Sequence, residues 1–296
     1  MLVWLNGKLI QRDSVLISAF DAGFQHGIGL FETVAARNRR VFRAQAHTRR
    51  LVESARQLLL SNSLHADPLA DALELVVQRN EMDSARVRLT VTGGNLNPSR
   101  ELRQTKIDPT ILIEAQPPTV YPDAFFERGV MVTIADGRDN PLNPMAGHKT
   151  LNYWPRIHAL QLAAAKKASE ALWFTVDNHV AAGSVSNIFL AIDDVLYTPI
   201  ARGEDPDRPS CVLPGITREA ILQIAERLDI PTERRMLDID RLLAADEVFL
   251  TNSSWGVLPV VAVEKSRIGR GQVGEMTSRL RQGWLELVER ETAGER

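Results

Sequence analysis

Few side chains in this sequence could carry covalent chemistry. The chain has one cysteine, Cys211, and only six lysines among its 35 basic residues. A lysine amine can bond to a carbonyl group and can also accept a proton. Lys149 stands out because it lies where a loop rich in proline and glycine, 141–147, meets an apolar element. The other lysines lie in a hairpin turn, in charged loops or at the polar end of a helix. In a loop, however, a lysine is usually a solvated charge.

Two other segments contain groups that could bind an anion. Gly215, Ile216 and Thr217 follow a proline at the expected start of a helix. The backbone N–H groups and the dipole of a helix start favour a phosphate, although Thr217 could equally cap an ordinary helix. The run 251–254 ends an expected strand with four consecutive hydrogen-bonding side chains. This run could complete an anion site or form a polar turn.

The composition excludes several other classes of protein. The 296-residue chain is 44% apolar and 24% charged, with a net charge of −2. Such a charge gives no electrostatic basis for binding nucleic acid or an anionic membrane. No stretch approaches about 18 uninterrupted apolar residues, and the N-terminus lacks the layout of a signal peptide. With one cysteine and no close spacing of histidines, we expect no metal site and a cytoplasmic location.

Hydrophobic periodicity indicates a mixture of strands and helices. Residues 2–5 and 8–11 flank Asn6-Gly7, a strong signal for a two-residue hairpin turn, and a second hairpin is expected between 31–35 and 41–42. A glycine-spaced loop is expected between the two hairpins. Helices are expected at 46–60, at 67–80 with Asp67 as N-cap, at 158–168, after Gly215 and near the C-terminus. Strands are expected at 85–92, 110–115, 130–134, 171–176, 187–192, 195–198, 247–251 and 259–263.

A proline-rich segment suggests where two domains meet. Residues 117–123 contain three prolines and interrupt the periodic pattern, so we expect a linker there. The division predicts a smaller N-terminal domain, 1–116, and a larger C-terminal domain, 124–296, that carries Lys149. Strands alternate with helices in both parts, which indicates mixed α/β or α+β domains.

A set of short segments also runs through nearly the whole chain in a characteristic order. The segments are 5–8, 21–33, 47–51 with 54–55, 145–152, 186–189, 213–218 and 251–260. Each is loose alone, but together they resemble the class IV (fold-type IV) aminotransferases. This family depends on pyridoxal 5'-phosphate and includes branched-chain and D-amino-acid aminotransferases and aminodeoxychorismate lyase. The resemblance implies a two-domain α/β fold like that of D-amino-acid aminotransferase.

The resemblance implies roles for the matching residues. Lys149 would form a Schiff base with the cofactor and then act as general base. Arg50 would bind the cofactor phosphate, because a bidentate guanidinium suits a dianion. The remaining phosphate contacts would come from Gly215, Ile216, Thr217, Asn252 and Ser253. Substrate contacts would come from Arg88, Phe31 and Ser254, although Arg88 could equally be an exposed strand arginine.

Two positions depart from the family pattern. Ala182 occupies the cofactor-binding position where the family has a glutamate that pairs with the pyridine nitrogen. Without that carboxylate the nitrogen loses the partner that keeps it protonated, so the cofactor becomes a weaker electron sink. Trp154 lies five positions after Lys149, where branched-chain enzymes often have a tyrosine, and the adjacent Tyr153 should point differently.

These implications favour an aminotransferase that moves an amino group between an amino acid and a 2-oxo acid. One alternative is a lyase of the aminodeoxychorismate type, in which the same chemistry expels pyruvate. Another is a member of the family that has lost catalysis, because of Ala182. The resemblance also implies a homodimer.

Overall fold

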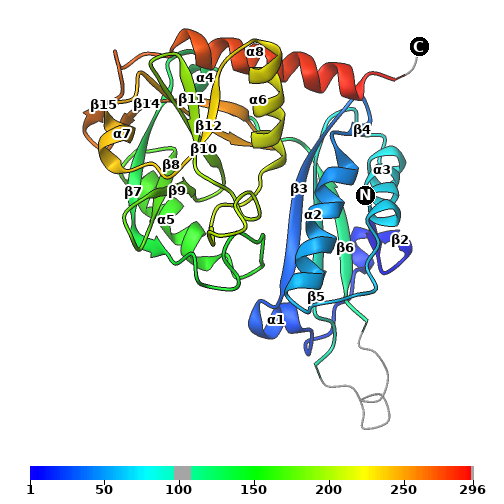
Figure 1. Cartoon of the computed structure of the whole chain (residues 1–296). Coiled ribbons are helices and arrows are strands. Elements are labelled where there is room, and N and C mark those ends of the chain that lie inside the picture. The colour runs from blue at the N-terminus through cyan, green and yellow to red at the C-terminus, as the bar shows by residue number, and fades with distance from the viewer. Residues whose placement is uncertain (97–107, 295–296) are drawn as a thin grey trace. The chain divides into compact units, whose positions relative to one another are not determined.

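The computed structural model describes residues 1–96 and 108–294, which form two compact units (Figure 1). The first unit contains Met1–Thr119, His148–Asn152 and Val288–Arg296, and the second contains Val120–Gly147 and Tyr153–Leu287. Across the two described ranges, no helix is both long enough and apolar enough to cross a membrane.

The first unit is built on a six-stranded antiparallel sheet in the order β2-β1-β6-β5-β3-β4. Its hairpin turn at Asn6 and Gly7 has φ values of 46° and 90°, the left-handed pair that a tight hairpin turn requires. The strands are β1 (Leu2–Leu5), β2 (Lys8–Gln11), β3 (Gly29–Arg37), β4 (Arg40–Val41), β5 (Ala85–Thr92) and β6 (Ile111–Gln116).

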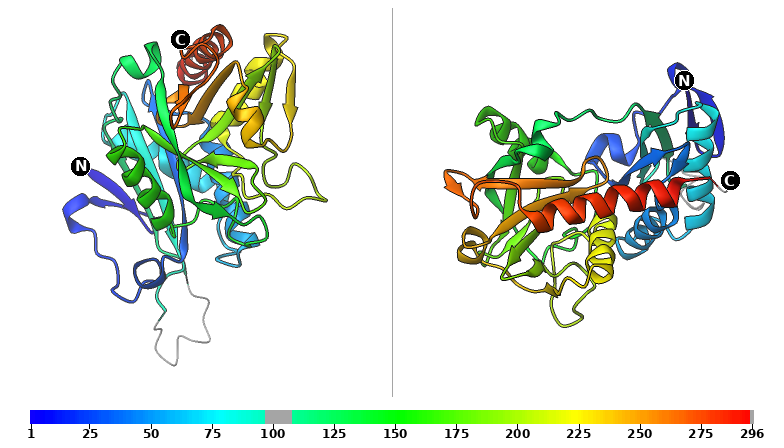
Figure 2. Two further views of the ribbon diagram at one scale, coloured as in Figure 1. Left: turned by 90° about the vertical axis from the view of Figure 1, so that its left-hand side faces the viewer. Right: turned by 90° about the horizontal axis from the view of Figure 1, so that it is seen from above.

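Two helices cover one face of this sheet. Helices α2 (Ala44–Gln57) and α3 (Ala66–Arg79) pack against each other and against the sheet (Figures 1 and 2). On β5, Val87 and Leu89 alternate with Arg88 and Thr90, and only the two apolar residues join the core beneath the helices. Since successive side chains of a strand point to opposite faces, Arg88 and Thr90 lie on the face away from the helices. Two short elements, η1 (Arg12–Ser14) and α1 (Ala22–His26), precede β3.

The second unit is built on a mixed nine-stranded sheet. Its order is β12-β11-β10-β13-β14-β7-β8-β9, and β15 pairs with β14. The pairs β11/β12, β14/β7 and β7/β8 are parallel, and the others are antiparallel. The strands are β7 (Val130–Asp139), β8 (Glu170–Thr175), β9 (Val180–Gly183), β10 (Asn187–Ile192), β11 (Val195–Thr198), β12 (Thr232–Arg234), β13 (Glu247–Asn252), β14 (Gly256–Val263) and β15 (Ser266–Arg267).

The helices of this unit pack on the sheet through small and apolar residues. They are α4 (Ala124–Glu127), α5 (Trp154–Ala165), α6 (Ile216–Arg227), α7 (Ile239–Leu243) and α8 (Glu275–Thr292). Helix α5 contacts β7 and β8, where Ala159 and Ala163 pack near Trp173. Helix α8 is continuous, and its residues from Val288 onward belong to the first unit.

Most expected elements are confirmed, within a few residues at their ends. Strands 85–92 and 187–192 and both hairpins are confirmed, and α6 begins directly after Gly215. The expectation of Asp67 as an N-cap is wrong, because α3 begins at Ala66 and its N-cap position is His65, which makes no side-chain capping bond. The glycine-spaced loop contains helix α1, and β9, β12 and α7 were not expected. These missed elements are three to five residues long, too short to show a period.

The structure places the Lys149 segment differently from the sequence-based division. That division puts Lys149 in the second domain, whereas residues 148–152 group with the first unit. The reason is backbone pairing of this segment with β3, a contact between residues more than a hundred positions apart. The first unit passes to the second at Thr119–Val120, inside the predicted linker, and a boundary between independently folding domains there stays a prediction.

Candidate active site

Lys149 is held beside the start of β3 by its own backbone. The Phe31 N–H donates to the Lys149 carbonyl (3.0 Å), and the Leu151 N–H donates to the Gly29 carbonyl (2.9 Å). Between these bonds, Leu30 and Thr150 form a β-bridge. Because backbone pairing fixes the register, the position of the Lys149 side chain along β3 does not depend on side-chain packing alone.

The Phe31 ring brings two cations together. The Lys149 Nζ lies 4.3 Å and the Arg88 Cζ 4.1 Å from the centroid of this ring. Phe31 pairs with Thr90 across β3 and β5, and the Arg88 Nε donates to the Thr90 Oγ1 (3.2 Å). The structure therefore brings three predicted site residues together: the Lys149 amine, which can react, and the Arg88 guanidinium, which can bind a carboxylate, both lie against the apolar ring of Phe31.

On the opposite side of β3, a buried carboxylate orients Arg50. Glu32 lies one position after Phe31 and is 1% exposed. The Arg50 Nε and Nη2 donate to its two oxygens (2.8 and 2.6 Å), and the His47 Nδ1 lies 2.8 Å from its Oε2. His47 and Arg50 are three positions apart on α2 and so share one face of that helix. The predicted phosphate arginine is thus held by a bidentate ion pair within its own unit.

The protonation states of Glu32 and His47 follow from their surroundings. Burial alone would raise the pKa of Glu32, but the Arg50 charge and the His47 hydrogen bond lower it to about 2. Burial lowers the pKa of His47, and the Arg50 and Lys149 charges lower it further, against the hydrogen bond to Glu32. At neutral pH, Glu32 is therefore ionised and His47 neutral, with its Nδ1–H donating to the carboxylate.

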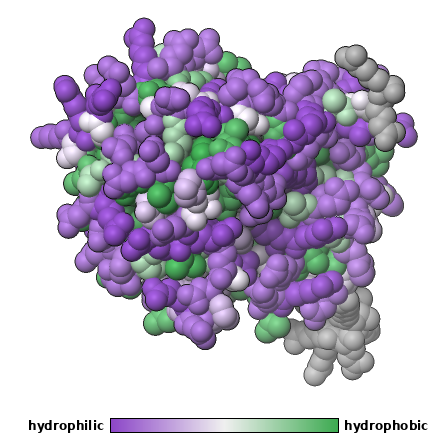
Figure 3. All heavy atoms as spheres, turned by 45° about the horizontal axis from the view of Figure 1, so that its top comes forward, coloured by the Kyte–Doolittle hydropathy of each residue, from purple (hydrophilic) through white to green (hydrophobic). Residues whose placement is uncertain are grey.

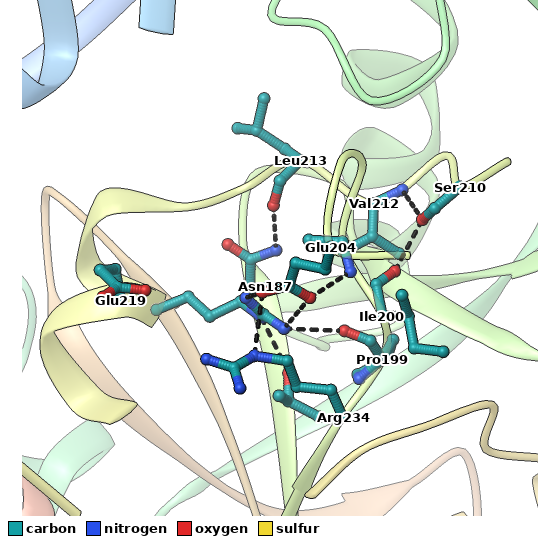
Figure 4. Close-up of polar contacts among 12 residues, drawn as sticks. Asn187, Pro199, Ile200, Glu204, Ser210, Val212, Leu213, Glu219 and Arg234 are labelled. Carbon is teal, nitrogen blue, oxygen red and sulfur yellow. Dashed lines mark hydrogen bonds and ion pairs between the residues drawn. The ribbon is translucent and has the colours of Figure 1, made fainter. Parts of the chain in front are cut away.

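In the second unit, the start of α6 is shaped by a close approach of Asn187. The N-cap is Gly215, with extended backbone and no side-chain cap, so Thr217 does not cap the helix. The Asn187 Nδ2 donates to the Leu213 carbonyl (2.9 Å; Figure 4). A Cβ at Gly215 would overlap the Asn187 Oδ1, so only glycine allows this approach. The first backbone N–H groups of a helix without a side-chain cap suit an anion.

The Asn252 side chain forms hydrogen bonds within the turn that follows it and with a neighbouring segment. Its Oδ1 accepts the Ser254 and Trp255 N–H groups (2.8 and 3.0 Å), and its Nδ2 donates to the Val185 carbonyl (3.3 Å). Ser253 and Ser254 are half-buried at the end of the β13–β14 hairpin. These bonds connect the 252–255 turn to the segment that precedes Asn187. Asn187 itself pairs with Thr251 across β10 and β13. The structure thus brings the predicted residues of β13 close to the start of α6.

Ala182 lies in β9, just before the segment 184–186 that contacts the Asn252 turn. It pairs with Trp173 of β8, and the segment after it is fixed by a fully buried carboxylate, Glu170. Glu170 accepts hydrogen bonds from the N–H groups of Ala171, Ser184 and Val185 and from the Ser186 hydroxyl. Burial raises the pKa of Glu170, although these bonds oppose the shift.

Tyr153, and not Trp154, reaches this segment. The Tyr153 hydroxyl donates to the Ser184 carbonyl (2.7 Å), whereas the Trp154 side chain is 70% exposed. Tyr153 immediately precedes α5, for which it is the N-cap residue, and this geometry directs its ring toward the sheet.

Sequence reasoning missed Glu32, His47 and Glu170. The signal for the first two was present: an acidic residue in an apolar strand, and a histidine and an arginine at helical spacing. For Glu170 the sequence offered no comparable signal, because its partners are mostly backbone groups. Among the residues that the structure describes, no three His, Cys, Asp or Glu side chains are grouped as a metal site.

Comparisons with known proteins agree with this geometry. The family model described as amino-transferase class IV matches residues 29–263. The chain is 28% identical to the branched-chain-amino-acid aminotransferase of Pseudomonas aeruginosa, over 98% of this chain and 94% of that protein.

Solved structures give the same result. The crystal structure of the Escherichia coli branched-chain amino acid aminotransferase is similar with a TM-score of 0.88 and 26% identity, covering 99% of this chain and 96% of that one. The T.th. branched-chain amino acid aminotransferase with pyridoxamine 5'-phosphate has a TM-score of 0.87 and 26% identity, with 97% and 93% covered. The 4-amino-4-deoxychorismate lyase of Pseudomonas aeruginosa has a TM-score of 0.81 and 28% identity, with 95% and 97% covered.

We predict that Glu32→Gln destabilises the protein in a pH-dependent way. At pH 7 the change leaves the Arg50 guanidinium buried without its counter-charge, which should lower the free energy of unfolding by about 3 kcal/mol. Because the folded-state pKa of Glu32 is lowered to about 2 from 4.5, its stabilisation is present above about pH 4.5 and is lost as the pH falls toward 2. Denaturant unfolding at pH 7 and pH 3 should therefore show the difference from wild type shrinking in acid.

Glu291→Gln is the matched control for this prediction. Glu291 pairs with Arg43 (3.0 Å) in the same unit but is one-third exposed, so its loss should cost at most about 1 kcal/mol. Equal losses for the two variants, or a Glu32→Gln difference that does not change with pH, would contradict the prediction.

Proposed function

The chain belongs to the class IV aminotransferases, and from this premise we propose how its own residues carry out pyridoxal-phosphate-dependent transamination. The reaction moves an amino group between an amino acid and a 2-oxo acid. The observation that carries the proposal is the placement of Lys149 beside Phe31 and Arg88. Membership of the family implies amino acids and 2-oxo acids as substrates, and the fold is that of the fold-type IV enzymes.

The residues present have the chemistry to hold the two reactive ends of the cofactor, its aldehyde and its phosphate. Lys149 supplies the amine that would hold it, and Arg50, already oriented by Glu32, supplies a cation for its phosphate. The start of α6 offers backbone N–H groups at Ile216 and Thr217 beside a glycine where a Cβ would not fit. Further donors would be the hydroxyls of Thr217 and Ser253. We assign Asn252 the supporting role of holding that turn, because its amide is engaged there.

Each substrate-facing residue has a distinct task. When bound, the cofactor supplies a ring that withdraws electrons from the substrate Cα. Lys149 Nζ is the base that removes and returns the proton at that carbon. Arg88 is placed to bind the substrate carboxylate, Phe31 forms an apolar wall under both cations, and Ser254 is a further polar contact. Lys149 therefore both accepts the proton from the substrate Cα and donates it back.

Ala182 does not fit the family pattern at the pyridine nitrogen. A methyl group cannot hold a proton there, so the electron-withdrawing power of the ring is lower than with a glutamate. This position favours slower chemistry and motivates a second possibility, a member of the family that binds the cofactor without turning over. The retained Lys149 and Arg50 speak against that possibility.

Pyruvate elimination is the alternative reaction. The similarity to the 4-amino-4-deoxychorismate lyase of Pseudomonas aeruginosa supports it. The same lysine base would serve both reactions, so the residues around Phe31 do not separate them.

We also propose that the chain forms a homodimer. Between positions 16 and 28, five large apolar side chains are at least 45% exposed: Leu16, Ile17, Phe20, Phe24 and Ile28. Most of the face drawn in Figure 3 is hydrophilic. Clustered exposed apolar residues mark protein interfaces. We further propose the cytoplasm as its location, in keeping with the single buried free thiol, Cys211.

We predict that Lys149 binds the cofactor covalently. After incubation with pyridoxal 5'-phosphate and reduction with borohydride, peptide mapping should find the label on Lys149. Lys149→Ala should lose the label, whereas Lys166→Ala, at an exposed helix end, should keep it. A wild-type protein that gains no label at saturating cofactor would exclude both enzymatic hypotheses.

Another prediction distinguishes transamination from pyruvate elimination. Cofactor-loaded enzyme mixed with amino-acid donors should complete one half-reaction, seen as a change in absorbance, and then stop until a 2-oxo acid is added. Release of pyruvate from aminodeoxychorismate without any added 2-oxo acid would instead identify a lyase.

A separate prediction concerns the homodimer. The 33.0 kDa chain should sediment at twice this mass. Phe24→Asp places a charge among the exposed apolar side chains and should shift the equilibrium toward the monomer. Val120→Asp changes a side chain that is 89% exposed in the second unit and should leave the dimer intact. A monomeric wild type, or an equal effect of the two changes, would contradict this interface.

A further inference from the structure

The connection between β11 and α6, residues 199–215, has no helix or strand, and most of it is a long loop, 199–213. Its chain is nevertheless fixed by internal bonds (Figure 4). The Ser210 hydroxyl donates to the Ile200 carbonyl (2.6 Å) and accepts the Val212 N–H (3.1 Å). The Arg202 N–H donates to the Val212 carbonyl (2.9 Å), so the two ends of the loop are joined.

A buried arginine in the first turn of α6 holds one side of this loop. Arg218 is the third residue of α6 and is 2% exposed. Its Nε donates to the Thr198 Oγ1 (3.1 Å) and its Nη2 to the Pro199 carbonyl (3.0 Å). These bonds join the helix start to the end of β11, where the loop begins.

Glu204 completes the surroundings of this arginine from within the loop. Its Oε1 accepts the Arg218 Nη1 (2.7 Å), and its Oε2 accepts the Arg218 Nη2 (2.9 Å) and the Ala201 N–H (2.7 Å). The exposed Arg234 reaches the same Oε1 from outside (3.0 Å; Figure 4). Partial burial would raise the pKa of Glu204, but the hydrogen bond and charge of Arg218 lower it.

The other side of the loop holds the chain that leads to Lys149. The Arg202 Nε donates to the Gly147 carbonyl (3.1 Å). Gly147 has a φ of +72°, and a Cβ there would lie 2.9 Å from the Arg202 Cβ and 3.1 Å from the Ser210 carbonyl oxygen. Only a residue without a side chain allows this approach, and Lys149 follows two positions later.

We propose that Glu204 is a positioning residue for the cofactor site: by pairing with Arg218 it fixes the 199–213 loop, which then holds the first turn of α6 on one side and Gly147 on the other. The inference rests on the proposed function, in which α6 meets the cofactor phosphate and Lys149 its reactive end. A bidentate carboxylate fixes both the position and the plane of the guanidinium, which a single hydrogen bond would not do.

The decisive experiment compares two ligands that differ only in the phosphate. Binding of pyridoxal 5'-phosphate and of pyridoxal is followed by quenching of tryptophan fluorescence in wild type and in Glu204→Gln. We expect the variant to bind pyridoxal 5'-phosphate about 10- to 100-fold more weakly, by analogy with the loss found when a side chain that orients a metal ligand is removed. Binding of pyridoxal, which has no phosphate to place, should change less than about threefold.

Two controls keep this result specific. Arg234→Gln removes the exposed partner of the same carboxylate oxygen and should change neither dissociation constant. Glu204→Asp keeps the charge but shortens the side chain, and it should show the same discrimination in smaller measure even if Glu204→Gln does not fold. An equal loss for both ligands, or no loss for either, would overturn the proposal.

The Gly147 side of the loop has its own test. Arg202→Ala should slow borohydride trapping of the cofactor on Lys149, whereas Arg208→Ala, an exposed residue of the same loop, should not. Equal trapping rates in the two variants would overturn this half of the inference. If the wild type does not bind the cofactor at Lys149, the proposed function itself fails. Wild-type binding with an unchanged preference for the phosphate in Glu204→Gln overturns only the role of Glu204.

Discussion

Strand β3 can point successive side chains only to opposite faces of its sheet, and this constraint separates two kinds of chemistry. Phe31 faces away from the helices, where the Lys149 and Arg88 cations lie against its ring. Glu32, the next residue, is buried on the other side, where α2 brings His47 and Arg50 onto its carboxylate. Because Lys149 is bonded to the backbone of β3 itself, the register that places Phe31 also places the lysine. A slip of one residue would exchange the two faces.

Each unit has an arginine whose side chain is at most 9% exposed, and each arginine is paired in the same way. Arg50 is held by both oxygens of Glu32, and Arg218 by both oxygens of Glu204. Burying the charge of either partner alone would cost several kcal/mol, so each buried arginine requires its carboxylate. Such pairs add little net stability compared with apolar side chains of similar size, and their advantage lies in fixed geometry. The sites where they occur are consistent with that advantage, since Arg50 and the first turn of α6 are the groups proposed to hold the phosphate.

Local patterns predicted most of the elements, but the organisation of the site depends on contacts that local patterns do not contain. The alternation along 85–92 and the Asn6-Gly7 turn were sufficient to place β5 and the first hairpin. Lys149, Arg50 and the start of α6 could be named from short segments. The pairing of 148–152 with β3 joins residues far apart in sequence, so local patterns do not indicate that this segment groups with the first unit. Glu204 lies in a charged loop whose composition is typical of solvated surface, and nothing local links it to Arg218.

The surroundings of Ala182 contain another carboxylate, Asp139, which is paired with a guanidinium. Across the sheet from Ala182, the Trp173 ring lies under the Arg156 guanidinium, 4.3 Å from the ring centroid. Arg156 also pairs with Asp139 (2.7 Å) and donates to the carbonyl of Gly183, the residue after Ala182 (3.4 Å). The charge brought to this side of β9 is thus a carboxylate already neutralised by a guanidinium. Burial raises the pKa of Asp139, although the charge and the hydrogen bond of Arg156 oppose the shift. Because position 182 has no carboxylate, the proposed reaction depends more heavily on Lys149, which would move the proton.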